Sequence, residues 1–265
     1  MKVLAIISSH QKKGNTATII SLIKEQMKSY AQKNGDSIKF ETLFLGDYNI
    51  NRCKGCSVCF KQREDKCPLK DDLLQVKSKI QEAEAVIFAG PVYVNAIDST
   101  MKGLIDRLSH VSHRPEFFDK CALIIVTTHK SGIKETIKTI DHALLTWGFH
   151  VVGKKGFPMK HTSREEVNQM YHKDIAKLAE KLYSGVKRKK YLNPSLAQLV
   201  VFDIMRYYRS NPDNIAKGDI FALDYEYFHE QGWTDPKKTY FIEHRANPLK
   251  VLLAKLISGI VRLSF

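Results

Sequence analysis

Four of the five cysteines are crowded into one short segment: Cys53, Cys56, Cys59 and Cys67. Their spacing, C-x2-C-x2-C-x7-C, allows the thiolates to turn inward around one small inorganic centre. Gly55 helps the backbone to curl, and Pro68 follows the last cysteine, as a proline does in ferredoxin-like runs. The spacing predicts an iron–sulfur cluster at these four residues. Zinc, which also accepts four thiolates, and free structural thiols are the alternatives.

A second candidate site is the loop Ser9–Thr16, which follows the apolar run Val3–Ser8 and precedes a helical pattern. A loop that enters a helix from a strand presents unpaired N–H groups at the positive end of the helix dipole, so it can hold a phosphate. Gly14 permits a close backbone approach, and the loop lacks the Gly-Lys-Ser/Thr of a Walker motif, which argues against an ATPase. Taken alone, the loop fits equally well an ordinary turn capped by Thr16.

The strands and helices that must position these residues alternate along the chain as far as about residue 184. The expected strands are Val3–Ser8, Ile38–Leu45, Ala85–Ala89, Ala122–Thr127 and Val151–Gly153. The expected helices are Thr16–Tyr30, Asp71–Glu82, Ser99–Leu108, Lys134–Trp147 and Ser163–Tyr183. Alternation of apolar strands with helices predicts a doubly wound, five-stranded parallel α/β sheet over residues 1–185. In a flavodoxin-like strand order, the ligand lies beyond the carboxyl ends of the strands.

Two further loops follow expected strands at that edge. Gly90–Asn95 combines a rigid proline turn with Tyr93, which suits a planar ligand. Thr127–Gly132 follows the fourth strand and carries His129.

The loops resemble those of NAD(P)H-dependent FMN reductases in the flavodoxin-like superfamily. Ser8–Thr16 is similar to the family's Gly-Ser-Pro-Arg-x-x-Gly-Asn-Thr loop, and Gly90–Arg107 looks like its (S/G)PVY…LK…(I/F)DR segment. Ser8, His10 and Gln11 depart from the pattern, and Gln11 replaces an arginine for which a neighbouring lysine, Lys12 or Lys13, could substitute.

The cysteine motif resembles that of the iron–sulfur flavoproteins, in which it holds a [4Fe–4S] cluster beside FMN. The resemblance implies that the four cysteines are metal ligands. It also implies that FMN is bound by Ser9, Gln11, Asn15, Thr16, Pro91, Val92, Tyr93, Asn95, Thr128, His129 and Gly132. His129 or Lys130 would stabilise an anionic reduced flavin, although an exposed histidine without that role is the simpler interpretation. Asp106 and Arg107 are expected to be an architectural pair, and Cys121 a buried core thiol.

From about residue 186 the alternation stops, and aromatic residues and Asn-Pro or Asp-Pro turns become frequent. We expect residues 186–265 to form a mostly helical extension. Its last segment, Pro248–Phe265, has the pattern of a basic amphipathic helix, which we expect to dock on the protein rather than on a membrane surface. The formal charge of +14 includes one dense basic run, Lys187–Lys190, but no recognition motif accompanies it, so we expect no nucleic-acid partner.

These observations predict an FMN-dependent NAD(P)H oxidoreductase that passes electrons to a small-molecule or protein acceptor. Nicotinamide nucleotide would bind transiently over the flavin and deliver hydride, and no side chain is expected to act as a catalytic acid or base. A non-catalytic, flavodoxin-like electron-transfer protein is the alternative. The crowded cysteines and the absence of a signal-peptide pattern favour the cytoplasm, and the superfamily favours a homodimer or homotetramer.

Overall fold

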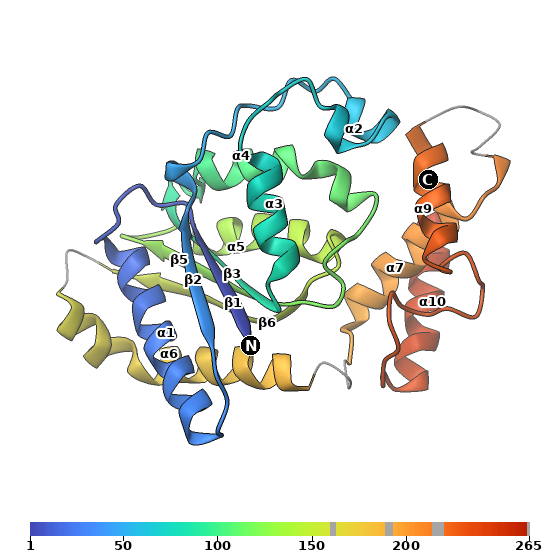
Figure 1. The fold of residues 1–265 in the computed structure, drawn as a ribbon. Helices are drawn as coiled ribbons and strands as arrows, with labels where there is room; N and C mark the ends of the chain where they lie inside the picture. Colours follow the sequence, from blue (N-terminus) through green and yellow to red (C-terminus); the bar gives the residue numbers. More distant parts are fainter. Residues whose placement is uncertain (160–162, 189–192, 214–219, 264–265) are drawn as a thin grey trace.

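The computed structural model describes residues 1–159, 163–188, 193–213 and 220–263 (Figure 1). Lys189 and Lys190 of the predicted basic run, and the last two residues of the predicted terminal helix, lie outside the described residues.

The centre of the fold is a parallel sheet whose strand order is β2-β1-β3-β5-β6. Its strands are β1 (Lys2–Ile7), β2 (Lys39–Phe44), β3 (Ala85–Tyr93), β5 (Cys121–Thr128) and β6 (His150–Pro158). Strands β1, β3 and β5 are apolar and almost wholly buried because helices cover both of their faces. The order confirms the predicted flavodoxin-like sheet.

Three features of the sheet differ from the prediction. Strand β3 continues to Tyr93, beyond the predicted end at Ala89, so residues 90–93 of the predicted loop belong to the strand. A sixth strand, β4 (Ala96–Ile97), forms a two-residue antiparallel pair with the end of β3, which is too short to leave a sequence pattern. Strand β6 continues to Pro158, well beyond the predicted end at Gly153. It lies at the edge of the sheet and is mostly half-buried, so glycines and lysines interrupt its apolar pattern.

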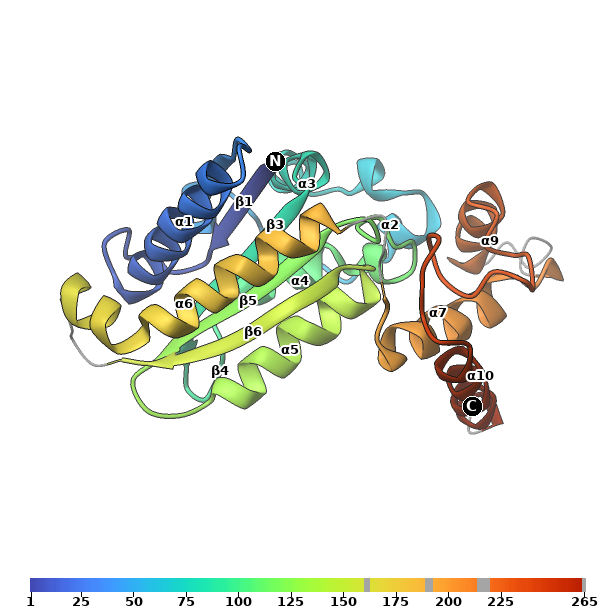
Figure 2. The same cartoon turned by 90° about the horizontal axis from the view of Figure 1, so that it is seen from below.

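Helices cover both faces of the sheet (Figure 2). Helices α1 (Asn15–Lys33) and α6 (Arg164–Lys187) contribute to the core on one face. Helices α3 (Leu73–Glu82), α4 (Ser99–Arg107) and α5 (Ile133–Thr146) contribute to the core on the other. Four short helical turns complete this part of the chain: η1 (Leu45–Asp47), α2 (Val58–Lys61), η2 (Glu64–Lys66) and η3 (Ser109–Ser112).

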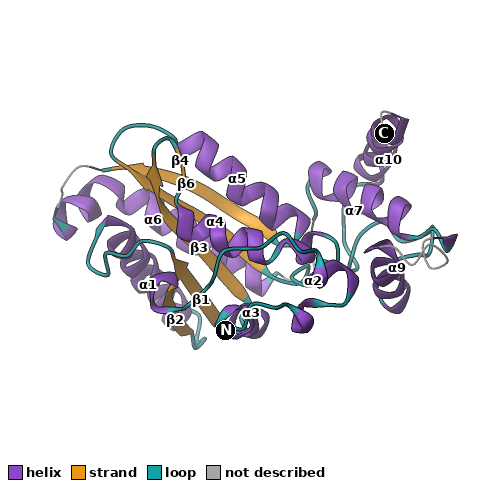
Figure 3. Cartoon of the chain, turned by 90° about the horizontal axis from the view of Figure 1, so that it is seen from above, coloured by secondary structure: helices purple, strands orange, loops and turns teal. Residues whose placement is uncertain are grey.

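The C-terminal extension is helical, as predicted, and lies beside one end of the sheet (Figure 3). It contains α7 (Leu196–Arg209), α9 (Ile220–Glu230) and α10 (Pro248–Leu263). An aromatic cluster around Phe202, Trp233 and Phe241 forms its core. Phe118, which precedes β5, packs edge-on against Trp233 with the ring centroids 5.1 Å apart, so the extension is joined to the sheet by side-chain packing.

Helix α10 packs against α7 through a narrow face on which Ala254 and Ser258 are buried. Several of its leucines stay exposed, up to 90% at Leu263. Among the residues described, no helix is both long enough and apolar enough to cross a membrane.

Candidate functional site

The phosphate loop joins β1 to α1 at the carboxyl edge of the sheet. Gly14 occupies the N-cap of α1 in an extended conformation, and no side chain caps the helix. The start of α1, with the backbone N–H groups of its first turn, lies at this loop. The Thr16 hydroxyl does not cap the helix; it lies 2.7 Å from the hydroxyl of Thr127 and so ties α1 to β5.

A cavity of about 640 Å³ opens beside this loop. It brings together the loop that follows β1, the carboxyl end of β3, and the carboxyl end of β5 with His129 after it, as the parallel topology requires. The predicted residues that line it are Ser9, Gln11, Asn15, Thr16, Pro91, Val92, Tyr93, Thr128 and His129. The three segments predicted to bind FMN thus line one cavity.

Asn95 and Gly132 are the predicted residues that do not line this cavity. The Ser131 hydroxyl donates to Asn95 Oδ1 at 2.5 Å, and Gly132 has a left-handed φ of 82°. A Cβ on Gly132 would lie 2.5 Å from Val92 Cγ1 and 2.6 Å from Asn95 Cα. These contacts hold the turn that follows β3 against the loop that follows β5.

The cavity also contains residues that were not predicted as FMN ligands: Lys13, Gly14, Thr127 and Ser163. Ser163 caps α6 in a reciprocal capping box with Glu166, and the spacing Ser-x-x-Glu is the sequence signal that marks it. The two lysines that could substitute for the family's arginine have different surroundings. Lys12 Nζ forms an ion pair with Asp47 Oδ2 at 2.8 Å, whereas Lys13 lines the cavity.

Buried polar contacts join the start of the phosphate loop to the start of α4. Ser8 Oγ donates to Asp98 Oδ2 at 2.5 Å, and the same carboxylate group accepts from the backbone of Thr100 and Met101 at the start of α4. Gly90 is required between them, because a Cβ there would lie 2.4 Å from Ser8 Oγ. Ser8, which departs from the family's glycine, therefore links the phosphate loop to α4.

The four predicted cysteines line one small cavity of about 100 Å³, together with Arg107 and His110. Left-handed residues at Gly55, Ser57 and Arg63 curl the loop around it. Cys53 and Cys56 are exposed, whereas Cys59 and Cys67 are partly buried. Burial, followed by the nearby sulfur of Cys53, raises the pKa of the Cys59 thiol. A metal centre bound by this thiolate would oppose the shift, because a nearby positive charge stabilises the ionised form.

His110 provides a second observation in favour of a bound centre. Its ring is 1% exposed, and neither ring nitrogen has a hydrogen-bond partner among the described residues. Burial lowers the pKa of His110 to about 4, so the imidazole is neutral and retains one N–H to donate. Four thiols and an unpartnered buried donor around one cavity fit an iron–sulfur cluster, whose sulfur atoms accept hydrogen bonds.

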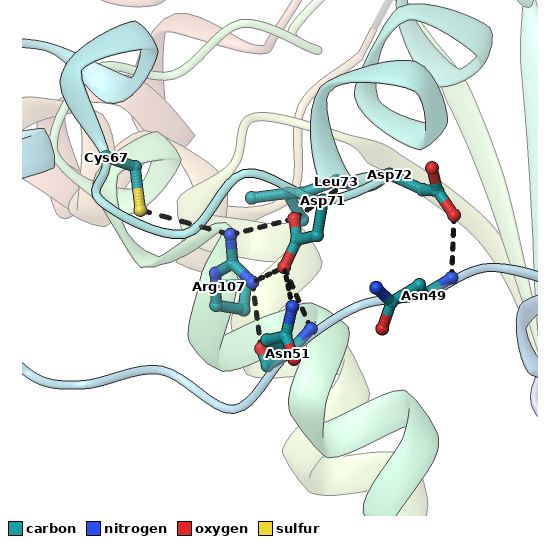
Figure 4. Close-up of polar contacts among 7 residues, drawn as sticks. All are labelled: Asn49, Asn51, Cys67, Asp71, Asp72, Leu73 and Arg107. Carbon is teal, nitrogen blue, oxygen red and sulfur yellow. Dashed lines mark hydrogen bonds and ion pairs between the residues drawn. The ribbon is translucent and has the colours of Figure 1, made fainter.

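A buried ion pair anchors both ends of the cysteine loop (Figure 4). Arg107 Nη1 lies 2.5 Å from Asp71 Oδ2, and Arg107 Nη2 lies 3.1 Å from Asp71 Oδ1. Asp71, after the loop, also accepts the backbone N–H of Asn51, before the loop, at 2.9 Å. Burial alone would raise the pKa of Asp71, but the hydrogen bonds from Arg107 and from backbone N–H groups outweigh it and hold the pKa at about 2.

This geometry corrects the expected pairing of Asp106 with Arg107. Asp106 instead pairs with Lys102 on the exposed side of α4, and Arg107 turns inward to Asp71 and lies 3.9 Å from Cys67 Sγ. Adjacent helical residues point in different directions, so they rarely pair with each other.

A second buried group lies against the cysteine cavity. Lys77 Nζ bridges Glu64 Oε1 at 2.5 Å and Glu116 Oε1 at 2.6 Å. Burial opposes the ionisation of Glu64, but the hydrogen bond and charge of Lys77 bring its pKa down to about 2. His110 Nε2 lies 3.8 Å from the same Glu64 oxygen. The single ammonium group thus pairs with two carboxylates, and one of them, Glu64, lines the cysteine cavity.

Comparison with known proteins agrees with this geometry. The sequence model of NADPH-dependent FMN reductases matches residues 1–164. An iron-sulfur flavoprotein of Archaeoglobus fulgidus is 27% identical over 235 residues, which are 88% of this chain and 100% of the relative. An iron-sulfur flavoprotein of Methanocaldococcus jannaschii is 30% identical over 155 residues, 58% of this chain and 76% of the relative.

Solved structures share the fold at low sequence identity. A flavone reductase superposes with a TM-score of 0.57 at 14% identity, covering 74% of this chain and 66% of its own. RosB, solved with 8-demethyl-8-formylriboflavin-5′-phosphate, superposes with a TM-score of 0.53 at 15% identity, covering 94% of this chain and 92% of its own. The family match confirms the resemblance seen in the loops: the chain belongs to the NADPH-dependent FMN reductase family and is a flavin-dependent oxidoreductase.

Proposed function

We propose that the protein is an FMN-dependent NAD(P)H oxidoreductase that binds FMN in the cavity beside Ser9–Thr16. The observation that carries this proposal is the meeting of the carboxyl ends of three strands and the start of α1 around one cavity of about 640 Å³. The phosphate would accept hydrogen bonds from the α1 N–H groups and from Ser9 and Asn15, with Lys13 supplying charge. Pro91–Tyr93 would lie along the flavin, and Thr128 and His129 would face its polar edge.

Bound FMN would supply hydride acceptance and one-electron transfer. This chain's residues would orient the ring and exclude water from one of its faces. Tyr93 is 56% exposed and lines the cavity, and we propose that the nicotinamide nucleotide would approach the bound flavin from this side. No side chain is assigned a proton-transfer role.

We further propose that Cys53, Cys56, Cys59 and Cys67 hold a [4Fe–4S] cluster. The cavity that all of them line and the unpartnered imidazole of His110 support this assignment. A bound cluster would supply single-electron steps between the flavin and an acceptor. The cysteine cavity and the FMN cavity share no lining residue, so a second copy of the chain in the expected homodimer or homotetramer is our proposed route between them.

The flavin proposal is tested by titrating the apoprotein with FMN and then mixing the complex anaerobically with NADH or NADPH in a stopped-flow instrument. We expect saturable binding and bleaching of the flavin absorbance by at least one nucleotide. Tight FMN binding with negligible bleaching by either nucleotide would identify a flavodoxin-like electron carrier instead.

The cluster proposal is tested by quantifying iron, acid-labile sulfide and zinc after anaerobic reconstitution. We expect iron and sulfide in equal amounts, and their loss in a Cys56→Ser variant. Zinc without sulfide would identify a structural metal site. If the protein binds neither iron nor zinc, the cysteines are free thiols.

The same proposal covers the domain boundaries, the cellular location and the oligomeric state. We propose that residues 1–185 form the FMN-binding domain and residues 186–265 the extension, which limited proteolysis near residue 190 would test. The protein is proposed to work in the cytoplasm, where crowded thiols stay reduced. Light scattering of the holoprotein would determine the oligomeric state.

A further inference from the structure

The C-terminal extension touches the cysteine loop directly. Helix α9 packs against α2, the short turn that contains Cys59, and Figures 1 and 3 both place α2 between the sheet and α9. At this contact lies Asp224 of α9, whose side chain is 0% exposed. A carboxylate so deeply buried requires charged partners.

The partners of Asp224 come from two parts of the chain. Arg114 Nη1 lies 2.8 Å from Asp224 Oδ1, and His113 Nδ1 lies 2.7 Å from Asp224 Oδ2; both residues follow η3 of the sheet domain. Arg209 of α7 approaches at 3.5 Å. The carboxylate therefore joins α9 to α7 and to the segment that follows η3.

Arg114 continues this connection to the cysteines. Its second terminal nitrogen, Nη2, donates to the backbone carbonyl of Cys59 at 2.6 Å. Since guanidinium is planar and rigid, the Asp224 carboxylate at one nitrogen orients the donor at the other. The ring of Phe60 also meets His113 edge-on, with centroids 4.6 Å apart. Two consecutive residues of the loop are thus held by side chains that Asp224 orients.

The loop itself has little packing of its own. None of the residues from 51 to 70 is buried, and α2 contributes no buried side chain. A segment without a core is positioned by the polar contacts at its ends and middle. Asp71 and Arg107 hold the ends, Lys77 holds Glu64, and the Arg114–Cys59 hydrogen bond is the contact that reaches a cysteine near the middle.

We propose that the extension is a clamp for the cysteine loop, with Asp224 acting through Arg114 to hold Cys59 in line with the other cysteines. Asp224 and Arg114 are positioning residues and do not contact the cluster as ligands. The clamp acts on the cluster site proposed above, but its effect on the loop does not require the cluster to be an iron–sulfur cluster.

The test compares Asp224→Asn with Asp203→Asn in the full chain. Asp203 is the matched control, because it is also a buried carboxylate of the extension, paired with Arg206 and Arg262, but it has no contact with the cysteine loop. The first readout is amide hydrogen exchange of peptides covering residues 53–67 in the metal-free protein. The second is the half-time with which bathophenanthroline, an iron chelator, bleaches the reconstituted cluster.

We expect Asp224→Asn to speed exchange in the loop on the order of tenfold, the effect of losing one charge-assisted hydrogen-bond connection, and to shorten the bleaching half-time. Asp203→Asn should leave both readouts at the wild-type value. Affinity for FMN should be the same in both variants. Loop exchange in Asp224→Asn that equals that of Asp203→Asn would overturn the clamp.

If Asp224→Asn does not fold, Arg114→Lys provides the same test, because lysine keeps a positive charge beside Asp224 but lacks the second terminal nitrogen that donates to the Cys59 carbonyl. Faster loop exchange in Arg114→Lys supports the clamp, and unchanged exchange overturns it. Should the wild-type protein bind no iron while the loop still loosens in Asp224→Asn, the clamp stands and the cluster assignment falls.

Discussion

Replacement of Asp71 by asparagine tests the buried Asp71–Arg107 ion pair, which holds the two ends of the cysteine loop together. The side chains of Asp71 and Arg107 are 1% and 2% exposed, and their contact is bidentate. The variant keeps the size of the side chain but removes the charge, so the Arg107 guanidinium stays buried without a counter-ion. Removing one partner of a buried pair costs about 3 kcal/mol or more.

An exposed pair on the same helix supplies the scale for comparison. Lys102 and Asp106 are each nearly half exposed and lie one turn apart on α4. Asp106→Asn should therefore change the free energy of unfolding by less than about 0.5 kcal/mol. Both variants lose one negative charge from α4 or its immediate surroundings. The difference between their free energies of unfolding therefore reports the effect of burying the ion pair.

The lowered pKa of Asp71 also makes the stability of the protein depend on pH. The pKa of this carboxylate in the folded protein is about 2, below the usual value of 3.8. A depressed pKa stabilises the fold while the carboxylate is ionised in the unfolded chain. The contribution, about 2 kcal/mol, is present above pH 4 or so and is lost as the pH falls toward about 2. Asp71→Asn should lack this part of the acid-induced loss.

Urea unfolding, followed by circular dichroism, measures these free energies for the wild type and both variants at neutral pH and at two acidic values. If Asp71→Asn is no less stable than Asp106→Asn at neutral pH, or if the wild type and Asp71→Asn lose stability in parallel on acidification, the account of the buried pair is refuted.

Two predictions concern the FMN cavity and are measured by titration with FMN. Gly132→Ala should weaken binding, because the new Cβ would lie 2.5 Å from Val92 Cγ1 and the left-handed φ of 82° is unfavourable for alanine; wild-type affinity in that variant would contradict the packing. Lys13→Ala should weaken binding by roughly tenfold and reduce its salt dependence, whereas Lys12→Ala, which removes the pair with Asp47, should change it little. Equal effects of the two lysine variants would contradict the assignment.

The part of the fold that sequence predicts well is the part governed by local pattern. The continuous apolar runs of β1, β3 and β5 identify central strands, and the topology of parallel sheets places their following loops at one edge. The predicted length of the edge strand β6 is too short because the strand is only partly buried, so its sequence is not continuously apolar. The pair β3–β4 depends on two residues and on the turn at Val94 and Asn95, which leaves no periodicity.

Contacts between distant segments are what the sequence could not supply. The cysteine spacing identified the loop, but not that Arg107 would turn to Asp71, which is 36 residues away, rather than to its neighbour. Ser163 lines the FMN cavity only because α6 begins at the same edge as the phosphate loop. Asp224 reaches Arg114 across 110 residues, and no local signal marks that pair.

The proposal as a whole depends most directly on the composition of the protein purified without air. The measurement is the absorbance spectrum, with flavin, iron and acid-labile sulfide quantified on the same sample. The account predicts stoichiometric FMN together with broad absorbance beyond the flavin bands and equal amounts of iron and sulfide. Protein that takes up no FMN when the cofactor is added would contradict the central claim, and protein that binds FMN but no iron or sulfide would contradict the cluster alone.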